Sequence, residues 1–449
     1  MQSISNIISL NDYFLLPLYL IGIFIISNLI KVRNISKYGY YQYLNLGLFC
    51  KLLGVIAFCL IYVYYYQGGD TINYFYGAQV ISNLIEQDFE KGIAILFNTD
   101  SYFNSWESFN PATGYPPHYM YKDPNTFIIC RISVPLYFLG AKSFLISSML
   151  TACFSYIGIW RIYRLFNTLY PGNYKVFSYF ILCLPTLIFW GGGIMKDSFV
   201  LGSTCWISYN FYMVLIRRQK LISNVIFFIF NLFLILNIKP YIIISLLPGM
   251  LFWLNSAYLN QLKSSLTRVF VFPILFVSIA TAAFFSYKNL SNLMGVYGDV
   301  DSAIQQAQVI QGDLLRDEQY GGNNYNIGQL DGSIGGLISV APLAIFTALF
   351  RPLFWEIGSP TMVLSVVENM ILLVFTIIIL MRISPIKLLK ILLGEPFLLY
   401  CFIFTILFAF GVGIAGTNFG ALVRYKIPLV PFFFSMIYLL FKSSKNSAP

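Results

Sequence analysis

The sequence predicts an all-α protein that crosses a membrane many times. Hydrophobic residues make up 58% of the 449 residues and charged residues only 10%, and apolar runs of about 20 residues recur along the chain. In hydrocarbon every backbone N–H and C=O group must be paired within the protein, and continuous apolar runs achieve this as helices rather than as alternating barrel strands. We therefore expect a single membrane domain over residues 1–449 with about 11 spanning helices.

Each expected span is an apolar run bounded by polar or turn-forming residues. The first is expected to be a retained helix rather than a signal peptide, because Met1–Asp12 carries no Lys or Arg and no small-residue cleavage pattern follows. In chain order the expected spans are Tyr13–Ile30, Leu46–Tyr66, Ser143–Phe166, Val176–Trp190, Ser198–Ile216, Ile222–Leu236, Tyr241–Trp253, Val269–Ser286, Pro360–Met381, Phe397–Val412 and Ile427–Phe441.

Two further apolar stretches are expected to stay on the outer face or to re-enter it. Thr126–Leu139 contains Arg131 and Pro135, and Ile334–Phe354 contains Pro342, Arg351 and Pro352. Charge and proline make both poor simple spans.

This assignment sorts the charges by loop. With the N-terminus outside and the C-terminus inside, most Lys and Arg residues, Lys37, Lys51 and Lys387 among them, fall on the inner side, where Glu395 is the single acid. The net charge of +10 is then explained by membrane topology, so we expect no nucleic-acid partner. Residues 67–142, with interfacial helices, and residues 288–359, with a re-entrant or interfacial segment, form two large outer segments.

Asp70 is the most informative candidate residue. It follows Gly68-Gly69 where an aromatic span meets the first outer segment, and Tyr74 would share its helix face one turn later. A carboxylate at this depth suits a general base or a ligand. The alternative is an N-cap that starts an interfacial helix.

A second candidate is the turn Trp190-Gly191-Gly192-Gly193-Ile194-Met195-Lys196-Asp197. Its glycines permit close backbone approach to a ligand, and Lys196 could meet a phosphate. Asp197 would begin the next helix, and the alternative is a helix cap with a neutralising interfacial lysine.

Other cations lie on the outer side, against the positive-inside bias. They are Lys239, Arg351, and Arg424 with Lys426, which flank Tyr425. Together they suit a phosphate site, whereas single ones would snorkel to headgroups. Glu368 within a span is expected to form a structural hydrogen bond. His118 is the sole histidine, so it is expected to be a loop residue that contacts substrate rather than a metal ligand.

These motifs resemble the GT-C superfamily of membrane glycosyltransferases, which includes protein O-mannosyltransferases and aminoarabinose transferases. The resemblance covers most of the chain through short motifs in a common order. They are Gly69-Asp70-Thr71 with Tyr74, Tyr115-Pro116-Pro117, Phe138-Leu139-Gly140-Ala141-Lys142-Ser143, Phe189-Trp190 through Lys196-Asp197, and Arg424-Tyr425-Lys426-Ile427-Pro428-Leu429-Val430-Pro431.

The resemblance implies transfer of a sugar from a polyprenyl-phosphate carrier to a glycan, lipid or protein acceptor at the outer face of a bacterial inner membrane. Asp70 would be the catalytic base, and Lys196, Asp197, Lys239, Arg351, Arg424, Tyr425, Tyr74 and His118 would bind substrate or phosphate. The family often has a second acid near the first, but Thr71 and Ile72 follow Asp70 here. We therefore expect no cofactor, with a divalent metal as an open alternative.

Two other classes remain open. A lipid-linked polysaccharide polymerase or ligase would rely more on the second outer segment than on Asp70. A transporter or flippase would show uptake into vesicles without sugar transfer. A structural subunit of an envelope complex would tolerate loss of both Asp70 and Arg424.

Overall fold

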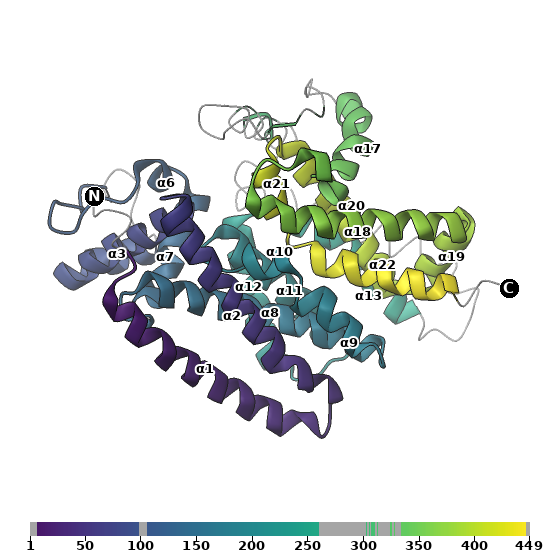
Figure 1. Ribbon diagram of the computed structural model, residues 1–449, viewed down its shortest axis with the longest axis horizontal. Coiled ribbons are helices and arrows are strands. Elements are labelled where there is room, and N and C mark those ends of the chain that lie inside the picture. Colours follow the sequence, from purple (N-terminus) through teal and green to yellow (C-terminus); the bar gives the residue numbers. More distant parts are fainter. Residues whose placement is uncertain are drawn as a thin grey trace. The chain divides into compact units, whose positions relative to one another are not determined.

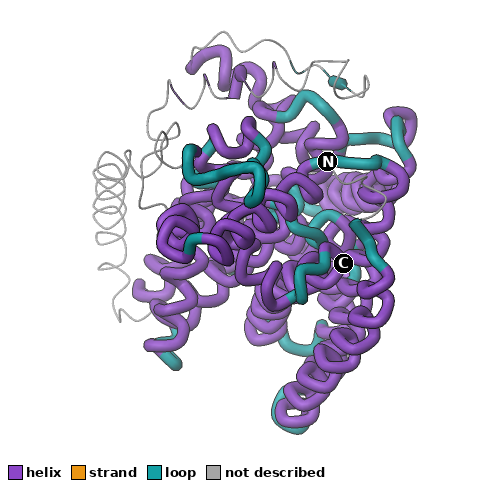
Figure 2. Tube along the Cα trace, turned by 90° about the vertical axis from the view of Figure 1, so that its left-hand side faces the viewer, coloured by secondary structure: helices purple, strands orange, loops and turns teal. Residues whose placement is uncertain are grey.

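The computed structural model describes residues 7–97, 106–259 and 334–445, together with a few single positions between 302 and 327. In this part of the chain every regular element is a helix (Figure 2), which confirms the all-α class there. The helices group into two compact units, which are described separately. Unit 1 is Met1–Trp206 with Asn237–Lys239, and unit 2 is Ile207–Leu236 with Pro240–Pro449.

Unit 1 contains the helices from α1 to the first part of α11 (Figure 1). They are α1 (Leu10–Ile35), η2 (Gly39–Tyr43), α2 (Leu44–Leu60), η3 (Ile61–Tyr65), α3 (Asp70–Gln87), α4 (Phe89–Phe97), α6 (His118–Lys122), α7 (Pro124–Leu139), α8 (Phe144–Leu169), α9 (Tyr174–Phe177), η4 (Ser178–Leu182), α10 (Pro185–Phe189) and α11 (Lys196–Phe211). The helix α3 packs on α7, and α2 packs on α8 and α10.

Unit 2 contains the later helices. They are η5 (Tyr212–Ile216), α12 (Leu221–Ile238), α13 (Tyr241–Leu259), α17 (Ile334–Phe350), η7 (Phe354–Glu356), α18 (Pro360–Arg382), α19 (Pro385–Gly394), α20 (Pro396–Ala415), α21 (Phe419–Tyr425) and α22 (Val430–Lys445). Helix α20 packs on α13, α17 and α22, around fully buried rings of Tyr400, Phe404 and Phe408.

Eight helices of the described residues are long and apolar enough to cross a membrane, as expected for a multi-pass membrane protein. They are Leu10–Ile35, Gly39–Tyr65, Phe144–Leu169, Lys196–Ile216, Leu221–Ile238, Tyr241–Tyr258, Pro360–Arg382 and Pro396–Ala415. Each overlaps an expected span. The expected span Ile427–Phe441 falls on Val430–Ser444 and on the break before it. This helix and the preceding Phe419–Tyr425 are bent by 75° at that break.

The expected span Val176–Trp190 differs from prediction, because it is not one continuous helix. The chain forms α9 and η4, breaks at Cys183 and Leu184, and restarts as α10 with Pro185 in its first turn. Proline lacks the N–H that a continuing helix would need and disfavours helical geometry at the residue before it. The expected span Val269–Ser286 lies outside the described residues.

Lys51 corrects the assignment of inner-loop charges. It lies in the interior of α2, within the span Gly39–Tyr65, and its side chain is fully buried. Its Nζ donates a hydrogen bond to the Leu187 carbonyl of α10, with an N–O distance of 2.6 Å. Lys51 therefore hydrogen-bonds to a backbone carbonyl of the broken helix and does not lie in a loop.

The two stretches that were expected not to cross are both helices. They are α7, with 16 residues, and α17, with 17 residues. At about 1.5 Å per residue each is roughly 25 Å long, shorter than the hydrocarbon core. Their lengths are compatible with interfacial or re-entrant placement.

Candidate functional site

Asp70 is the first residue of α3, so the helix cap is its neighbour and not Asp70 itself. Gly69 is the N-cap residue, with φ of +110°, a conformation that side chains rarely adopt. A Cβ atom on Gly69 would also lie 2.9 Å from the Tyr62 ring. Glycine thus allows the sharp turn that brings α3 back toward the aromatic end of the preceding span, and Asp70 in the first turn is favoured by the helix dipole.

One turn along α3 from Asp70, Asn73 contacts α6. The Asn73 Nδ2 atom donates a hydrogen bond to the Tyr119 hydroxyl at 2.9 Å. Partial burial and the nearby Asp70 carboxylate raise the pKa of Tyr119 to about 12. Tyr119 is therefore a neutral phenol at physiological pH, close to Asp70.

Lys196 is the first residue of α11. Its Nζ donates a hydrogen bond to Thr126 Oγ1 at 2.6 Å and lies 3.6 Å from Asp123 Oδ2. Asp123 is the N-cap of α7 and accepts hydrogen bonds from Asn125 N and Thr126 Oγ1. The lysine side chain is 23% exposed, so it is only partly open to solvent, and its ammonium group is held on α7.

Asp197 and Lys239 form a buried ion pair beside Lys196. Lys239 Nζ lies 2.7 Å from Asp197 Oδ1, and the side chains are only 10% and 2% exposed. A paired arrangement is what allows both charges to be buried. The pair joins the start of α11 to the Asn237–Lys239 segment of the same unit.

We call Asp70, Asp123, Lys196, Asp197 and Lys239 the unit 1 cluster. Lys196 interacts electrostatically with Asp123, Lys239, Asp70 and Asp197. The structure thus brings four sequence-predicted residues together, Asp70, Lys196, Asp197 and Lys239, from segments far apart in the chain. Chemically, the cluster offers a carboxylate that can accept a proton and, on a partly exposed lysine side chain, an ammonium group that can bind an anion.

The three glycines before Lys196 have a packing role that differs from the predicted one. A Cβ on Gly193 would lie 2.1 Å from the Phe58 ring, and one on Gly191 would lie 2.6 Å from Lys51 Nζ. Both neighbours belong to α2. The glycines allow the turn to press against α2, and this contact fixes where α11 and Lys196 begin.

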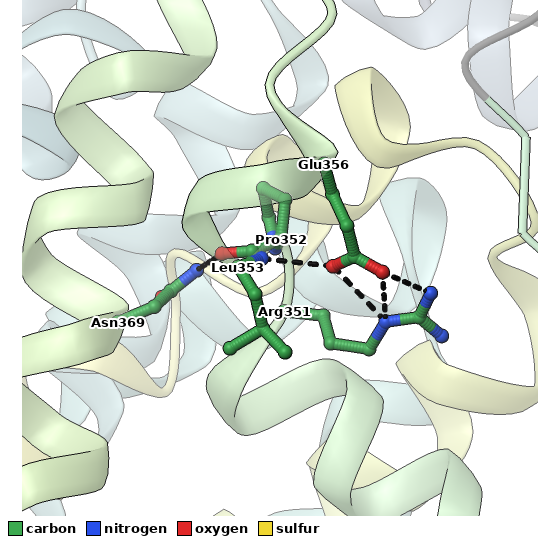
Figure 3. Close-up of polar contacts among 5 residues, drawn as sticks. All are labelled: Arg351, Pro352, Leu353, Glu356 and Asn369. Carbon is green, nitrogen blue, oxygen red and sulfur yellow. Dashed lines mark hydrogen bonds and ion pairs between the residues drawn. The ribbon is translucent and has the colours of Figure 1, made fainter.

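Arg351 lies in unit 2, in a second charged cluster. Figure 3 shows its guanidinium facing the Glu356 carboxylate; Nε lies 2.9 Å from Oε1 and 3.2 Å from Oε2. The Leu353 amide donates to the same carboxylate at 2.8 Å. The guanidinium also lies over the rings of Tyr325 and Phe419. Arg351 is therefore engaged by an acid and two aromatic rings.

Lys426 completes this second cluster; it was predicted to be an outer cation beside Arg424 but was not selected as a site residue. It is 3% exposed, and its Nζ donates to Asn369 Oδ1 at 2.7 Å and to the Arg351 carbonyl at 3.1 Å. Asn369 in turn donates to the Pro352 carbonyl at 3.2 Å (Figure 3). Asn369 stands next to Glu368 on α18, and both are buried. The signal that could have revealed this network is the Glu368-Asn369 pair inside an otherwise apolar span.

The other predicted residues lie as follows. Tyr74 is only 3% exposed and belongs to the packed face of α3. His118 begins α6 and is exposed. Arg424 and Tyr425 are half-buried at the end of α21 in unit 2, with the guanidinium 6.0 Å from the Tyr425 ring centroid.

Asp123, Thr126, Asn73 and Tyr119 were missed by the sequence analysis. Asp123-Pro124 has the signature of a helix start, with a capping acid before a first-turn proline, and Asn73 lies three residues after Asp70 on the same helix. Within the described ranges, no group of three or more His, Cys, Asp or Glu side chains is arranged to hold a metal ion.

Comparisons with protein-family models, with curated proteins and with solved structures return no match to this chain.

Proposed function

We propose that the protein is a membrane glycosyltransferase that moves a sugar from a polyprenyl-phosphate carrier to an acceptor hydroxyl at the outer face of the inner membrane. The observation that carries this proposal is that Lys196, whose side chain is partly exposed, interacts electrostatically with Asp70 in the unit 1 cluster. A proton acceptor beside an anion-binding ammonium group is the combination that this reaction needs.

In the proposed reaction, Asp70 accepts the proton of the acceptor hydroxyl as its oxygen attacks the anomeric carbon of the donor. The bond between that carbon and the phosphate oxygen breaks, and the polyprenyl phosphate leaves with the electron pair. Negative charge grows on the phosphate in the transition state, so a fixed cation such as Lys196 stabilises it more than the ground state.

The remaining cluster residues support these two groups. The buried Asp197–Lys239 pair anchors the start of α11, and Asp123 with Thr126 orients the Lys196 ammonium. Such fixed positioning avoids reorganisation during the reaction. Arg351, Arg424 and Tyr425 belong to unit 2, and their part in phosphate binding stays a prediction.

A lipid-linked polysaccharide polymerase or ligase is the second candidate. The second charged cluster favours it, because Arg351 lies within the second outer segment, where it pairs with Glu356, and its backbone carbonyl accepts a hydrogen bond from the buried Lys426. That reaction class would depend on these cations more than on Asp70.

The test compares Asp70→Asn with wild type in cells that lack the chromosomal gene. Asparagine keeps the size of the side chain but cannot accept the proton, and general-base assistance is typically worth about 10²–10⁴-fold in rate. We expect the glycan product to disappear and its lipid-linked donor to accumulate. Mass spectrometry of envelope glycans and lipid-linked intermediates measures both.

Asp88→Asn is the matched control. Asp88 ends the same helix, at the opposite end from Asp70, and pairs with Lys91 on the surface. If the Asp70→Asn variant is present at the wild-type protein level and still produces normal glycan, Asp70 is not the base. Loss of product in Lys426→Met but not in Asp70→Asn would favour the polymerase or ligase.

A further inference from the structure

A group of aromatic side chains is displayed on unit 1 next to Asp70. Trp106 lies at its centre, with ring centroids 5.7 Å from Tyr115 and 5.3 Å from His118. Tyr119, the neighbour of His118 on α6, is 56% exposed, and Tyr115 is 43% exposed. We call Trp106, Tyr115, His118 and Tyr119 the aromatic ledge.

The ledge has a packed base. Trp106 also contacts Phe109 and Tyr121, with ring centroids 6.1 Å and 5.0 Å away. These two rings are 3% and 5% exposed. The outer rings therefore rest on a hydrophobic core instead of moving freely in solvent.

The loop that bears the ledge is tied to α3 by hydrogen bonds. Asn83 Nδ2 donates to the Thr113 carbonyl, and Asn110 Nδ2 donates to Gln87 Oε1, both at 3.2 Å. The Asn110 side chain accepts from the Ala112 and Thr113 amides at 2.9 Å and 3.1 Å.

The backbone between the tie and the ledge is also constrained. Gly114, with φ of +80°, packs against Tyr76, where a Cβ would lie 3.1 Å from the hydroxyl. Pro116 and Pro117 then fix two φ angles before α6 begins. Exposed rings on a fixed backbone lose little conformational entropy when they bind a ligand.

Helix α3 connects the ledge to Asp70. It begins with Asp70, holds the ledge loop through Asn83 and Gln87 near its other end, and donates from Asn73 to the Tyr119 hydroxyl at 2.9 Å. Tyr119 is the ledge residue near Asp70, so a sugar stacked on it would lie beside the proposed base.

We propose that the aromatic ledge is the acceptor subsite and binds the sugar ring of a glycan acceptor, rather than a lipid or a protein. This inference rests on the proposed glycosyl transfer at Asp70. A pyranose has an apolar C–H face that stacks on aromatic rings and a rim of hydroxyl groups that hydrogen-bond to polar neighbours. The ledge supplies the rings, and Asn73 with the Tyr119 hydroxyl supplies polar partners.

Aromatic side chains also gather at membrane interfaces, where they anchor a protein in the headgroup layer. The surroundings of the ledge favour a sugar over lipid. Glu107, Lys122 and Asp123, which neighbour ledge residues in the chain, are exposed, so charged side chains interrupt the apolar character of this part of the surface.

The test measures equilibrium binding of fluorescently labelled soluble oligomers of glucose, mannose and N-acetylglucosamine to the full-length protein in lipid nanodiscs. Tyr115→Ala and Tyr119→Ala should each weaken binding about tenfold, the effect of losing one aromatic stacking contact. Tyr179→Ala is the matched control, because Tyr179 is 53% exposed in η4, outside the ledge, and should bind like wild type.

Adding Asp70→Asn separates the two proposals. Loss of its transfer activity concerns the base, whereas oligomer binding by the Tyr115 and Tyr119 variants concerns the ledge. If Asp70→Asn transfers sugar normally while the ledge variants lose binding, the assigned base fails and the ledge stands. If wild type binds none of the oligomers, or if the ledge variants bind like wild type, the ledge is not a glycan subsite. Ledge variants that keep binding but unfold in nanodiscs at lower temperature would assign the ledge to the membrane interface instead.

Discussion

The residues of unit 1 whose burial costs the most free energy are the charged ones. Asp197 and Lys239 are nearly inaccessible and lie 2.7 Å apart. Desolvation of each charge is unfavourable, and the attraction between them offsets that cost only while both are present. Such a pair contributes little more to the free energy of unfolding than an apolar pair of the same volume would. Loss of one partner, however, leaves an unpaired buried charge, which is strongly destabilising.

We expect Lys239→Met to lower the free energy of unfolding by about 3–5 kcal/mol, because the Asp197 carboxylate loses its lysine. The double variant Asp197→Asn with Lys239→Met should recover a large part of this loss, since it removes both charges. Equilibrium unfolding in mixed detergent micelles with increasing SDS measures the difference. Equal stability of the single and double variants would contradict a coupled pair.

At this scale the sequence predicted the residue types better than their partners. Asp70, Lys196, Asp197 and Lys239 could be selected because charge is rare in apolar surroundings. Their grouping in unit 1 depends on long-range packing, which no local pattern encodes. The same limit explains Lys51, which was counted with the inner-loop cations but is buried against the Leu187 carbonyl.

At the scale of elements, glycines determine which helices pack closely. A Cβ on Gly158 of α8 would lie 2.2 Å from the Gly202 carbonyl oxygen of α11. The backbones of these helices are therefore in direct contact, and α11 is the helix that begins with Lys196. Membrane helices associate closely through such small residues because packing replaces the hydrophobic effect.

Gly158→Ala should therefore destabilise unit 1 by about 1–3 kcal/mol, the usual effect of overpacking a close contact. Gly22→Ala in α1 is the matched control, because nothing lies within 4 Å of its added Cβ. The control should be neutral or up to about 1 kcal/mol more stable, since alanine favours helix over glycine. Unfolding in the same micelles compares the two, and equal effects would argue against backbone contact between α8 and α11.

The sequence predicted most long helices because a span of apolar residues is a local property. It was less informative about Val176–Trp190, where hydrophobicity continues but the helix breaks before Pro185. There the freed backbone is accommodated by α2, through the Lys51 hydrogen bond to Leu187 and the close approach of Gly54 to Ile188. A hydrophobicity pattern does not show that a neighbouring helix pairs with the backbone groups left free at a helix break.

At the scale of the whole molecule, function depends on which side of the membrane each segment faces. The amphipathic helix α19 exposes Lys387 and Lys390 alongside apolar Ile386 and Leu389. This pattern is typical of a helix that lies in the membrane interface, and its lysines favour the inner side. The first outer segment, which bears the aromatic ledge, is predicted to face the opposite side.

Labelling with a membrane-impermeant maleimide tests this orientation through His118→Cys and Lys387→Cys. Both positions are exposed, whereas the seven native cysteines are buried or half-buried and should give little background. We expect His118→Cys to react in intact spheroplasts and Lys387→Cys to react only after permeabilisation, because the lysine-rich loops stay inside. The wild-type protein is the control for background labelling. The reverse pattern would place Asp70 on the cytoplasmic side, where a transfer reaction at the outer face could not use it. Labelling of both positions in intact spheroplasts would mean that the number of spans between them differs from the predicted number.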